Sequence, residues 1–335
     1  MKILKVGHTK KTILILFSLL VIAAIYFFSN SKGTLNRRNT HFAVESTNQI
    51  KKIIISASDE KLLLIKENEQ WKINNKYIAR QSVVDNFLMA LNMLQVSSPL
   101  SNNEKEEVAK MLEREGIQVE IFKKNRRLRN YYVSTPAMTN DKTYMMMVKR
   151  GEPFAIRIPA FKGLVAELFS TNEELWRDKT IFDYKPQNIK TISIEYPGQP
   201  SKSFELINFG DGTFALKNPN ENSFVEDFNL EKSIRYFTYF QGIKFERIEN
   251  EMSQQRSDSL LNSEPYCRIT VTDMENYENS ITIFRKPAEQ EYDEFGNKIK
   301  YDYDRAYAFF NQNNELIIIQ YYIFDPLLKE IDYFR

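Results

Sequence analysis

The chain has 335 residues, with 46 lysines and arginines against 44 aspartates and glutamates, so the formal net charge at pH 7 is +2. This near-balance argues against a nucleic-acid-binding protein, which needs a strongly basic surface to contact phosphates. The single cysteine, Cys267, rules out an intramolecular disulfide, so a hydrophobic core must hold the chain folded. Because 42% of the residues are hydrophobic, the chain can bury one large core or two smaller ones.

An almost unbroken apolar run, ILILFSLLVIAAIYFF, occupies residues 13–28 and follows four lysines. A helix over residues 12–29 would be roughly 27 Å long, close to the hydrocarbon thickness of a bilayer. The lysines predict that residues 1–11 are a cytoplasmic tail, that residues 12–29 are a transmembrane anchor and that the remainder lies outside the cytoplasm. The expected location is the inner (cytoplasmic) membrane, crossed once. A cleaved signal peptide is the alternative, disfavoured because the apolar run is longer than the usual signal-sequence core.

The polar stretch at residues 30–47 has no sustained periodicity, which predicts a flexible tether. After it, short β-rich runs separated by turn residues predict an antiparallel meander and a first α+β module over residues 48–182. A short helical stretch near residues 163–169 is expected to end this module. The strands predicted for the module lie at residues 51–57, 61–67, 70–74, 116–122, 129–134, 143–149 and 153–159.

Two further helices are predicted between these strands. In the first, apolar residues recur at helical spacing after Ser82, which is the expected N-cap. The second is expected over Asn103–Glu115, because Ser101 and Glu104 have the spacing of a capping box and Gly116 can stop a helix.

The second half of the chain repeats this order of elements, so that Ile189 corresponds to Ile50. The repeat is of domain size, which predicts a tandem duplication of one module and places the second module at residues 183–335. The fold class is therefore α+β, with two modules of mainly antiparallel sheet after an N-terminal transmembrane helix. Coincidental likeness of two generic α+β halves is the alternative. The strands predicted here lie at residues 189–196, 201–208, 212–218, 265–273, 279–286, 306–312 and 315–322.

The main helix of the second module is expected in residues 229–240. Leu230, Ile234 and Phe237 have the spacing of an apolar stripe on that helix. A short helix over residues 324–334 is expected to close the chain.

The junction between the modules reads TNEELWRDKTIFDYKPQNIKTISIEYPG over residues 171–198, and it resembles a signature of the bacterial domain of unknown function 4340. Residues 292–334, with DEFGNKIKYDYDRAYAFF and QYYIFDPLLKEIDYF, resemble the C-terminal part of the members found in Bacteroidetes. The resemblance implies a membrane-anchored envelope protein, and some relatives are encoded beside ABC-transporter components of the gliding-motility type. It implies no activity, ligand or catalytic residue.

The predicted folded region contains no histidine, because His8 lies in the tail and His41 in the tether. This excludes Ser-His-Asp and Cys-His catalysis and histidine-bound zinc. The sequence contains no GxGxxG, Walker A or GxSxG motif. Cys267 lies in a strand pattern and is expected to be a small buried residue rather than a reactive thiol. We therefore predict that the chain is not an enzyme and has no cofactor or metal.

Five positive charges gather where one predicted strand ends and the next begins. They could contact phospholipid headgroups or an acidic partner. A solvated hairpin tip is the favoured alternative, because charge runs are common at turns. The five residues are Lys123, Lys124, Arg126, Arg127 and Arg129.

An acidic group near the C-terminus offers the oxygen ligands that calcium prefers, although its spacing misses the EF-hand pattern. The favoured alternative is that the segment from Asp293 to Asn297 is a hairpin turn. The group consists of Glu291, Asp293, Glu294, Asp302 and Asp304.

Trp176 and Arg177 lie in the polar junction, where exposed aromatic and arginine neighbours could anchor a partner. The favoured alternative is that Trp176 caps the first core while its neighbours fix the turn between the modules. The second half also carries an aromatic cluster that is expected to be core, although such a stripe could bind glycans or an extended peptide. The cluster consists of Tyr236, Phe237, Tyr239 and Phe240.

These observations predict a single-pass, extracytoplasmic, non-catalytic module that binds a partner protein in an envelope or transporter-associated assembly. Free edge strands of the antiparallel sheets are one expected means of binding. Two alternatives remain. The first is an envelope glycan hydrolase that uses paired carboxylates, with Asp302 and Asp304 as candidates. The second is a tethered small-ligand receptor with a cleft between the modules.

Overall fold

The computed structural model describes residues 17–23, 37–139, 141–149, 151–292, 295–310 and 315–335. The predicted cytoplasmic tail and most of the predicted anchor lie outside these residues, and residues 17–23 of the anchor are helical. Within the described ranges, no helix is both long enough and apolar enough to cross a membrane.

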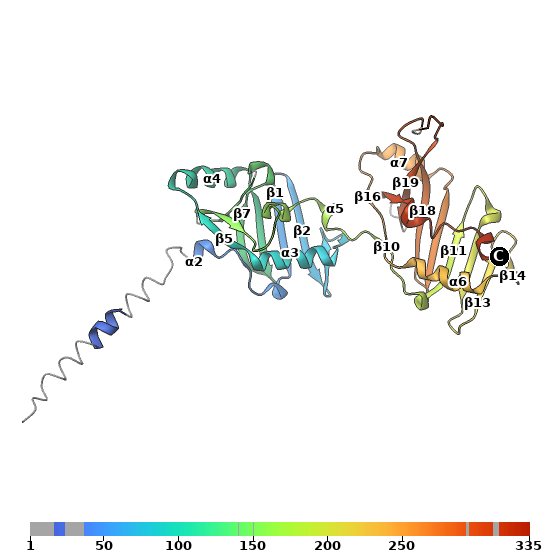
Figure 1. Cartoon of the computed structure of the whole chain (residues 1–335), viewed down its shortest axis with the longest axis horizontal. Coiled ribbons are helices and arrows are strands. Elements are labelled where there is room, and N and C mark those ends of the chain that lie inside the picture. Colours follow the sequence, from blue (N-terminus) through green and yellow to red (C-terminus); the bar gives the residue numbers. More distant parts are fainter. Residues whose placement is uncertain (1–16, 24–36, 140, 150, 293–294, 311–314) are drawn as a thin grey trace, which may run out of the picture. The chain divides into compact units, whose positions relative to one another are not determined.

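The chain divides into two units, Met1–Trp176 and Arg177–Arg335, and each is described by itself (Figure 1). Unit 1 is built on a nine-stranded sheet in the order β4-β3-β2-β1-β6-β7-β8-β9-β5, and every pairing in it is antiparallel. Its strands are β1 (Lys52–Ala57), β2 (Glu60–Glu67), β3 (Gln70–Ile73), β4 (Tyr77–Ile78), β5 (Gln95–Pro99), β6 (Ile117–Lys123), β7 (Arg126–Val133), β8 (Thr143–Met147) and β9 (Pro153–Arg157).

Unit 2 has a nine-stranded antiparallel sheet in the order β14-β13-β12-β11-β17-β18-β19-β20-β16, and a separate two-stranded pairing of β10 with β15. Position by position, the order of the large sheet is the same as in unit 1. Its strands are β11 (Ile189–Glu195), β12 (Phe204–Asn208), β13 (Phe214–Asn218), β14 (Ser223–Val225), β16 (Arg247–Ile248), β17 (Cys267–Asp273), β18 (Glu278–Pro287), β19 (Tyr301–Phe310) and β20 (Leu316–Gln320), and the small pair is β10 (Thr180–Phe182) with β15 (Ile243–Lys244).

The central pairings of the two sheets also agree in register. Ile53 of β1 lies opposite Ile121 of β6, and Ile192 of β11 lies opposite Val271 of β17. All four side chains are buried, because alternate residues of a strand face the same side of a sheet. The shared order and register support the tandem duplication predicted from the sequence, and the mixed α+β class with antiparallel sheets is confirmed.

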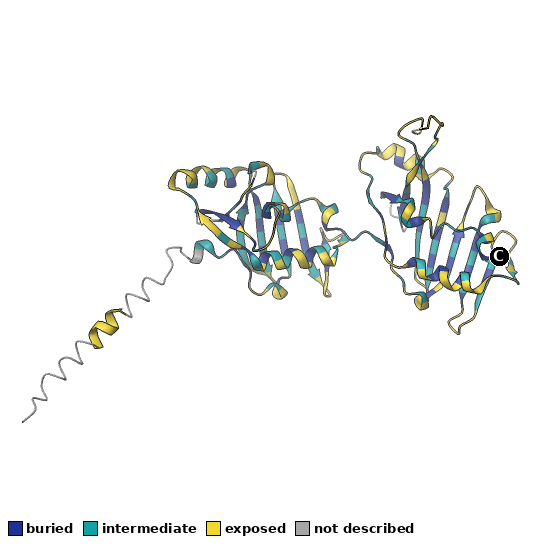
Figure 2. Ribbon diagram, viewed as in Figure 1, coloured by how far each residue is buried: buried dark blue, intermediate teal, exposed yellow. Residues whose placement is uncertain are grey.

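The main helices occur at equivalent points in the order of elements in the two units. Helix α3 (Gln81–Met93) in unit 1 and α6 (Leu230–Phe237) in unit 2 come between the opening meander and the far edge strand. Helix α4 (Asn102–Glu115) in unit 1 and α7 (Gln254–Leu261) in unit 2 come between that edge strand and the return to the centre of the sheet. In unit 2 the second helix packs Leu260 against Phe284 and Phe309, whereas the neighbouring Ile283 and Ala308 face the main core, so this helix covers the opposite face. Figure 2 shows buried residues along the strands of both sheets. The helices are α2 (Arg37–Thr40), α3 (Gln81–Met93), α4 (Asn102–Glu115) and α5 (Glu173–Trp176) in unit 1, and α6 (Leu230–Phe237), α7 (Gln254–Leu261) and α8 (Tyr321–Phe324) in unit 2.

The ends of the unit 1 helices test the capping predictions. The capping box of Ser101 and Glu104 at the start of α4 is confirmed. Ser82 is not the N-cap of α3, because the helix already begins at Gln81 and Arg80 is its N-cap. The backbone N–H of Arg80 donates to the Trp176 carbonyl at 2.7 Å, which fixes this start without a side-chain cap.

Gly116 ends α4 for a steric reason. Its φ is −71°, so it does not use the left-handed conformation that glycine favours. A Cβ atom at this position would lie 2.3 Å from the carbonyl oxygen of Leu112, so only glycine fits where the helix passes directly into β6.

The prediction of a flexible tether through residue 47 is wrong for its last part. Phe42 and Val44 are buried in the core of unit 1, and the Phe42 ring packs edge-on against Tyr131 at 6.0 Å. The Asn92 amide donates to the Val44 carbonyl at 3.0 Å, and Arg129 donates to the Ala43 carbonyl. The sequence pattern misled because two isolated apolar residues show no periodicity, yet they are enough to fix a segment against an existing core.

The apolar stripe predicted for α6 is confirmed at Phe237 but is wrong at Leu230 and Ile234. Leu230 and Ile234 are each 47% exposed, whereas Tyr236 and Phe237 are buried. The helix is short and continues as a 3-10 turn over Thr238–Phe240, so its inward face is set by the aromatic residues at its end. Large rings bury more area than branched aliphatic side chains, and this decides the rotation of the helix.

Several elements escaped prediction because they are short or polar. They include edge strands β4, β5, β14 and β16, the small pair β10 and β15, and helix α7, whose sequence QQRSDSLL is mostly polar.

Candidate functional site

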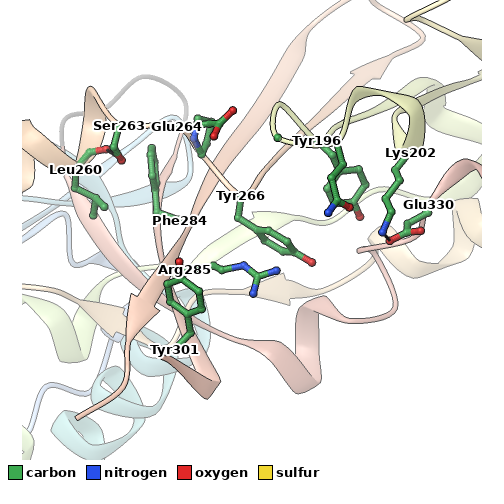
Figure 3. A pocket seen from close by; sticks show the side chains of 13 residues that line it. Tyr196, Lys202, Leu260, Ser263, Glu264, Tyr266, Phe284, Arg285, Tyr301 and Glu330 are labelled. Carbon is green, nitrogen blue, oxygen red and sulfur yellow. Dashed lines mark hydrogen bonds and ion pairs between the residues drawn. The ribbon is translucent and has the colours of Figure 1, made fainter. Parts of the chain in front are cut away.

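An open pocket of about 530 Å³ lies in unit 2, where α7 leads into β17 and where β18 and β19 extend beyond the core (Figure 3). Its lining is aromatic and charged, with backbone from the turn after β11. The principal side chains are Tyr196, Lys202, Tyr266, Arg285, Tyr301 and Glu330. This is the strongest candidate for a binding site among the described residues, because it combines a cavity with convergent polar and aromatic groups.

The pocket depends on a hairpin extension that unit 1 does not share. In unit 1, β7 ends at Val133, which pairs with Ile117 at the start of β6. The corresponding residue of unit 2, Ile283, pairs with Cys267, but β18 continues to Pro287. Ile281, Ile283 and Arg285 face the same side of the strand, so Arg285 prolongs the inward row just past the end of the core.

Arg285 lies close to two tyrosine rings, those of Tyr266 and Tyr301, which Figure 3 shows near its side chain. The guanidinium carbon is 4.3 Å from the ring centroid of Tyr266 and 5.2 Å from that of Tyr301. Within the described part of the chain, this guanidinium makes no hydrogen bond or ion pair, and the residue is exposed. The two rings therefore contact the guanidinium while its N–H groups stay available.

The wall beside Arg285 is held by interactions within unit 2. The Tyr196 hydroxyl donates to the Lys329 carbonyl at 3.0 Å, and the rings of Tyr196 and Tyr266 meet edge-on at 5.9 Å. Burial raises the pKa of Tyr196, so it remains a neutral donor. Lys202 and Glu330 form an ion pair at 2.6 Å and thereby neutralise each other.

A second pocket of about 380 Å³ adjoins the first and shares Tyr266, Arg285 and Tyr301 with it. Its other side chains include Tyr303 and Tyr321, and burial raises the pKa of Tyr321 to about 12. The two pockets together form a continuous surface on both sides of Arg285.

Lys286, the neighbour of Arg285, points to the other face of β18 and is 6% exposed. Its Nζ lies 2.9 Å from carboxylate oxygens of both Asp302 and Glu289. Burial alone would lower the pKa of Lys286, but the two carboxylates outweigh it and raise the pKa. Burial alone would raise the pKa of Asp302, but Lys286 and the backbone N–H groups of Asp304 and Arg305 lower it. This cluster fixes the base of the hairpin extension.

This arrangement separates Asp302 from the acidic group that the sequence suggested as a calcium site. Asp302 is paired with Lys286, and Asp293 and Glu294 lie outside the described residues. Tyr292 and Lys298 form an antiparallel bridge, in agreement with the hairpin that the sequence suggested there. Among the described residues there is no group of three or more ligating side chains that could hold a metal ion.

The five predicted basic residues lie at and near the β6–β7 turn. Lys123, Lys124, Arg126 and Arg127 are exposed, Lys123 donates to Gln49 at 2.7 Å, and Arg127 pairs with Glu120 at 2.8 Å. Arg129 is apart from them, because it is half-buried and donates to the Ala43 carbonyl of the N-terminal segment. The structure therefore places four of the five together at a solvated hairpin tip.

Trp176 and Arg177 belong to different units and are both buried. Trp176 packs edge-on against Phe87 at 5.0 Å in unit 1, and its indole N–H donates to the Ser170 carbonyl. Arg177 is 7% exposed and pairs with Glu315 at 2.5 Å in unit 2. Neither side chain offers a surface anchor. Trp176 lies in the first core, as the favoured alternative held, whereas the described partner of Arg177 is Glu315 of unit 2 rather than a residue of the turn between the modules. The aromatic cluster around Tyr236 is likewise core, as is Cys267, whose pKa burial raises.

The sequence did not identify Tyr266, Arg285 and Tyr301 as a site. Tyr266 and Arg285 occur in ordinary strand patterns and Tyr301 precedes the strand predicted at residues 306–312. Their juxtaposition depends on pairing between β17, β18 and β19. The one signal that was available is the arginine that follows Ile281 and Ile283 at alternate positions, where a further apolar residue would be expected.

Comparison with known proteins gives one match. Residues 71–227 match the family model described as Domain of unknown function (DUF4340). The match begins in β3 of unit 1 and ends just after β14 of unit 2, so it includes the junction whose residues carried the resemblance. Neither the curated proteins nor the solved structures contain a match. Residues 71–227, just under half of the chain, therefore match the DUF4340 family, as the resemblance predicted, and the description of that family assigns no function.

Proposed function

We propose that this chain is a non-catalytic binding protein, anchored by residues 12–29, whose two units lie outside the cytoplasm and whose second unit holds a partner protein of an envelope or transporter-associated assembly. The apolar N-terminal run supports the anchor. The tyrosine-arginine pocket of unit 2 supports the binding role.

The observation that carries this proposal is the contrast between the units at the pocket. Unit 1 builds the same nine-stranded sheet with β7 ending at Val133, so the fold does not need the extension that presents Arg285. An exposed arginine beside tyrosines is a composition typical of binding surfaces, where tyrosine and arginine contribute much of the affinity.

The side chains considered for glycan hydrolysis fit that role poorly. A general acid in such an enzyme needs a raised pKa, whereas the pKa of Asp302 is lowered by Lys286 and two backbone N–H groups. Binding without chemistry therefore accounts better for this cluster.

Addition of a partner strand to a sheet edge is also disfavoured as the binding mode. Edge strands β4 and β16 have two residues each and β14 has three. Edges this short offer few free backbone groups, which is how natural sheets avoid unwanted pairing. The fourth edge strand, β5, has five residues, but it ends in Pro99 and its register shifts between Val96 and Ser98, and both features hinder pairing. The pocket is the better surface for a partner.

The test is affinity capture of the full-length chain after crosslinking in its native membrane, with mass spectrometry of the captured proteins. The comparison uses a chain that lacks residues 48–335, the variants Arg285→Ala and Arg285→Lys, and the matched control Arg268→Ala, whose arginine is exposed on neighbouring β17. We expect one stoichiometric partner with the wild-type chain and Arg268→Ala, and severalfold less with both Arg285 variants. Recovery of nothing beyond the truncated control would refute the binding role.

A further inference from the structure

We infer that the pocket around Arg285 recognises a carboxylate of an acidic peptide segment, which lies along the two adjoining pockets of unit 2. This inference rests on the proposed binding function and names the chemistry of its ligand.

The geometry at Arg285 selects the ligand group. The rings of Tyr266 and Tyr301 lie 4.3 Å and 5.2 Å from the guanidinium carbon. The N–H groups make no hydrogen bond or ion pair within the described residues, so a ligand can reach them from the open pocket. A planar carboxylate matches these N–H groups with two parallel hydrogen bonds. The rings also restrict rotation of the side chain, which lowers the entropy lost on binding.

The surrounding charge favours a single carboxylate over phosphate. Three cationic side chains and four anionic ones line the two pockets, among them the Lys202–Glu330 pair. Asp302 is neutralised by Lys286, while Glu264 and Asp325 form no ion pair with any described residue. A doubly charged phosphate would meet these carboxylates with stronger repulsion than a singly charged group.

The shape of the site favours an extended segment over a small molecule. The two pockets share Tyr266, Arg285 and Tyr301, and both are open to solvent, whereas small-ligand sites usually enclose most of their ligand. Tyr303, at the end of the second pocket, is 71% exposed. A peptide would place its carboxylate at Arg285 and its neighbouring residues against the tyrosines on either side.

The test uses phenylglyoxal, which modifies available arginines, on the full-length chain in detergent, with the rate at each arginine read by mass spectrometry. Arg268 is the internal control, since it is exposed on β17 and lies 3.6 Å from Glu195. The probes are N-acetylglutamate amide, N-acetylglutamine with a free α-carboxylate, the neutral N-acetylglutamine amide and inorganic phosphate, each at about 10 mM, well above the millimolar dissociation constant expected of a single contact.

We expect N-acetylglutamate amide, N-acetylglutamine or both to slow modification of Arg285 at least threefold, while the neutral amide leaves it unchanged and Arg268 reacts at the same rate throughout. Protection by the first probe alone would identify an acidic side chain, and protection by the second alone a chain terminus. Equal protection by the neutral amide, stronger protection by phosphate or no protection at all would overturn the inference.

The outcome separates this inference from the proposed function. If a partner is captured equally by the wild-type chain and by Arg285→Lys, which keeps the charge but loses the planar fork, the binding role stands and the carboxylate site is wrong. If Arg285 is protected but no partner is captured, the site stands and the proposed assembly role is wrong.

Discussion

Unit 1 and unit 2 have the same sheet order and the same central register, yet they differ in several places besides the β10–β15 pair of unit 2. Unit 1 holds an N-terminal segment in its core through Phe42 and Val44, and its helix α4 passes directly into β6 at Gly116. Unit 2 instead has a five-residue connection after α7 and a long β18–β19 hairpin that carries Arg285. The two units therefore share one scaffold with different additions. Unit 1 binds the segment that follows the predicted anchor, and unit 2 presents a pocket.

The two units can be followed separately with natural reporters. Both tryptophans, Trp71 and Trp176, are buried in unit 1, and the single cysteine, Cys267, is buried in unit 2. Tryptophan fluorescence therefore follows unfolding of unit 1, while alkylation of Cys267 follows opening of unit 2, because burial raises the pKa of its thiol and shields it from the reagent.

The largest effect is expected from Phe42→Ala, which removes the N-terminal segment's main contact with unit 1. Phe42 is 1% exposed and packs against Tyr131 and Phe154, so the free energy of unfolding of unit 1 should fall by roughly 3–5 kcal/mol. Denaturant titration should shift the tryptophan transition and leave the Cys267 transition in place. Phe224→Ala is the control, because Phe224 is 61% exposed. An unchanged tryptophan transition would mean that the segment does not stabilise unit 1.

The next effect belongs to unit 2 and concerns the base of its hairpin. Lys286→Met removes the cation that pairs with Asp302 and Glu289, and leaves a largely buried carboxylate unpaired. Unit 2 should lose roughly 3 kcal/mol, measured by the denaturant dependence of Cys267 alkylation. Lys110→Met, at an exposed ion pair with Glu106, should change stability by at most about 0.5 kcal/mol. Equal effects of the two substitutions would show that the hairpin base is not held by this cluster.

A smaller effect is the pH dependence of the stability that unit 2 loses in Lys286→Met. Since the folded-state pKa of Asp302 is lowered, its stabilisation is complete above its unfolded-state pKa and is lost as the pH falls through the folded-state value. The pKa of Lys286 is raised, so its own stabilisation is lost only as the pH rises through the folded-state value. The cost of Lys286→Met should therefore be smaller at about pH 3 than at about pH 7. A cost that does not change between these two pH values would contradict the assigned pair.

The smallest effect is expected at the N-caps of the equivalent helices α4 and α7. Ser101→Ala removes the capping box of α4 and should destabilise unit 1 by about 1 kcal/mol. Ser253 stands at the N-cap of α7 but its side chain makes no capping hydrogen bond, so Ser253→Ala should leave the Cys267 transition nearly unchanged. Thermal unfolding read by the two reporters would show both effects, and a larger loss in unit 2 than in unit 1 would reverse this assignment.

Much of the fold could be predicted from the sequence where local patterns and tertiary packing agree. The alternating apolar residues of β1, β2, β6 and their counterparts predicted strands, and the likeness of the two halves predicted the repeated module. The capping box at Ser101 needs only neighbouring residues, and it was predicted correctly. The prediction for α6 failed at Leu230 and Ile234, because the helical period allows either their face or the face of Tyr236 to point inward. The space available to the rings of Tyr236 and Phe237 decides which face is buried.

The α+β class and the division into two similar halves follow from the sequence, because period-two patterns and local turn signals act between close neighbours, and the junction motif predicted the family match of residues 71–227. The folded structure was needed to show that Phe42 enters the unit 1 core, that Trp176 and Arg177 are buried, and that Arg285 contacts Tyr266 and Tyr301. These facts depend on contacts between residues distant along the chain, and such contacts are set by strand register and by competition among side chains for buried space.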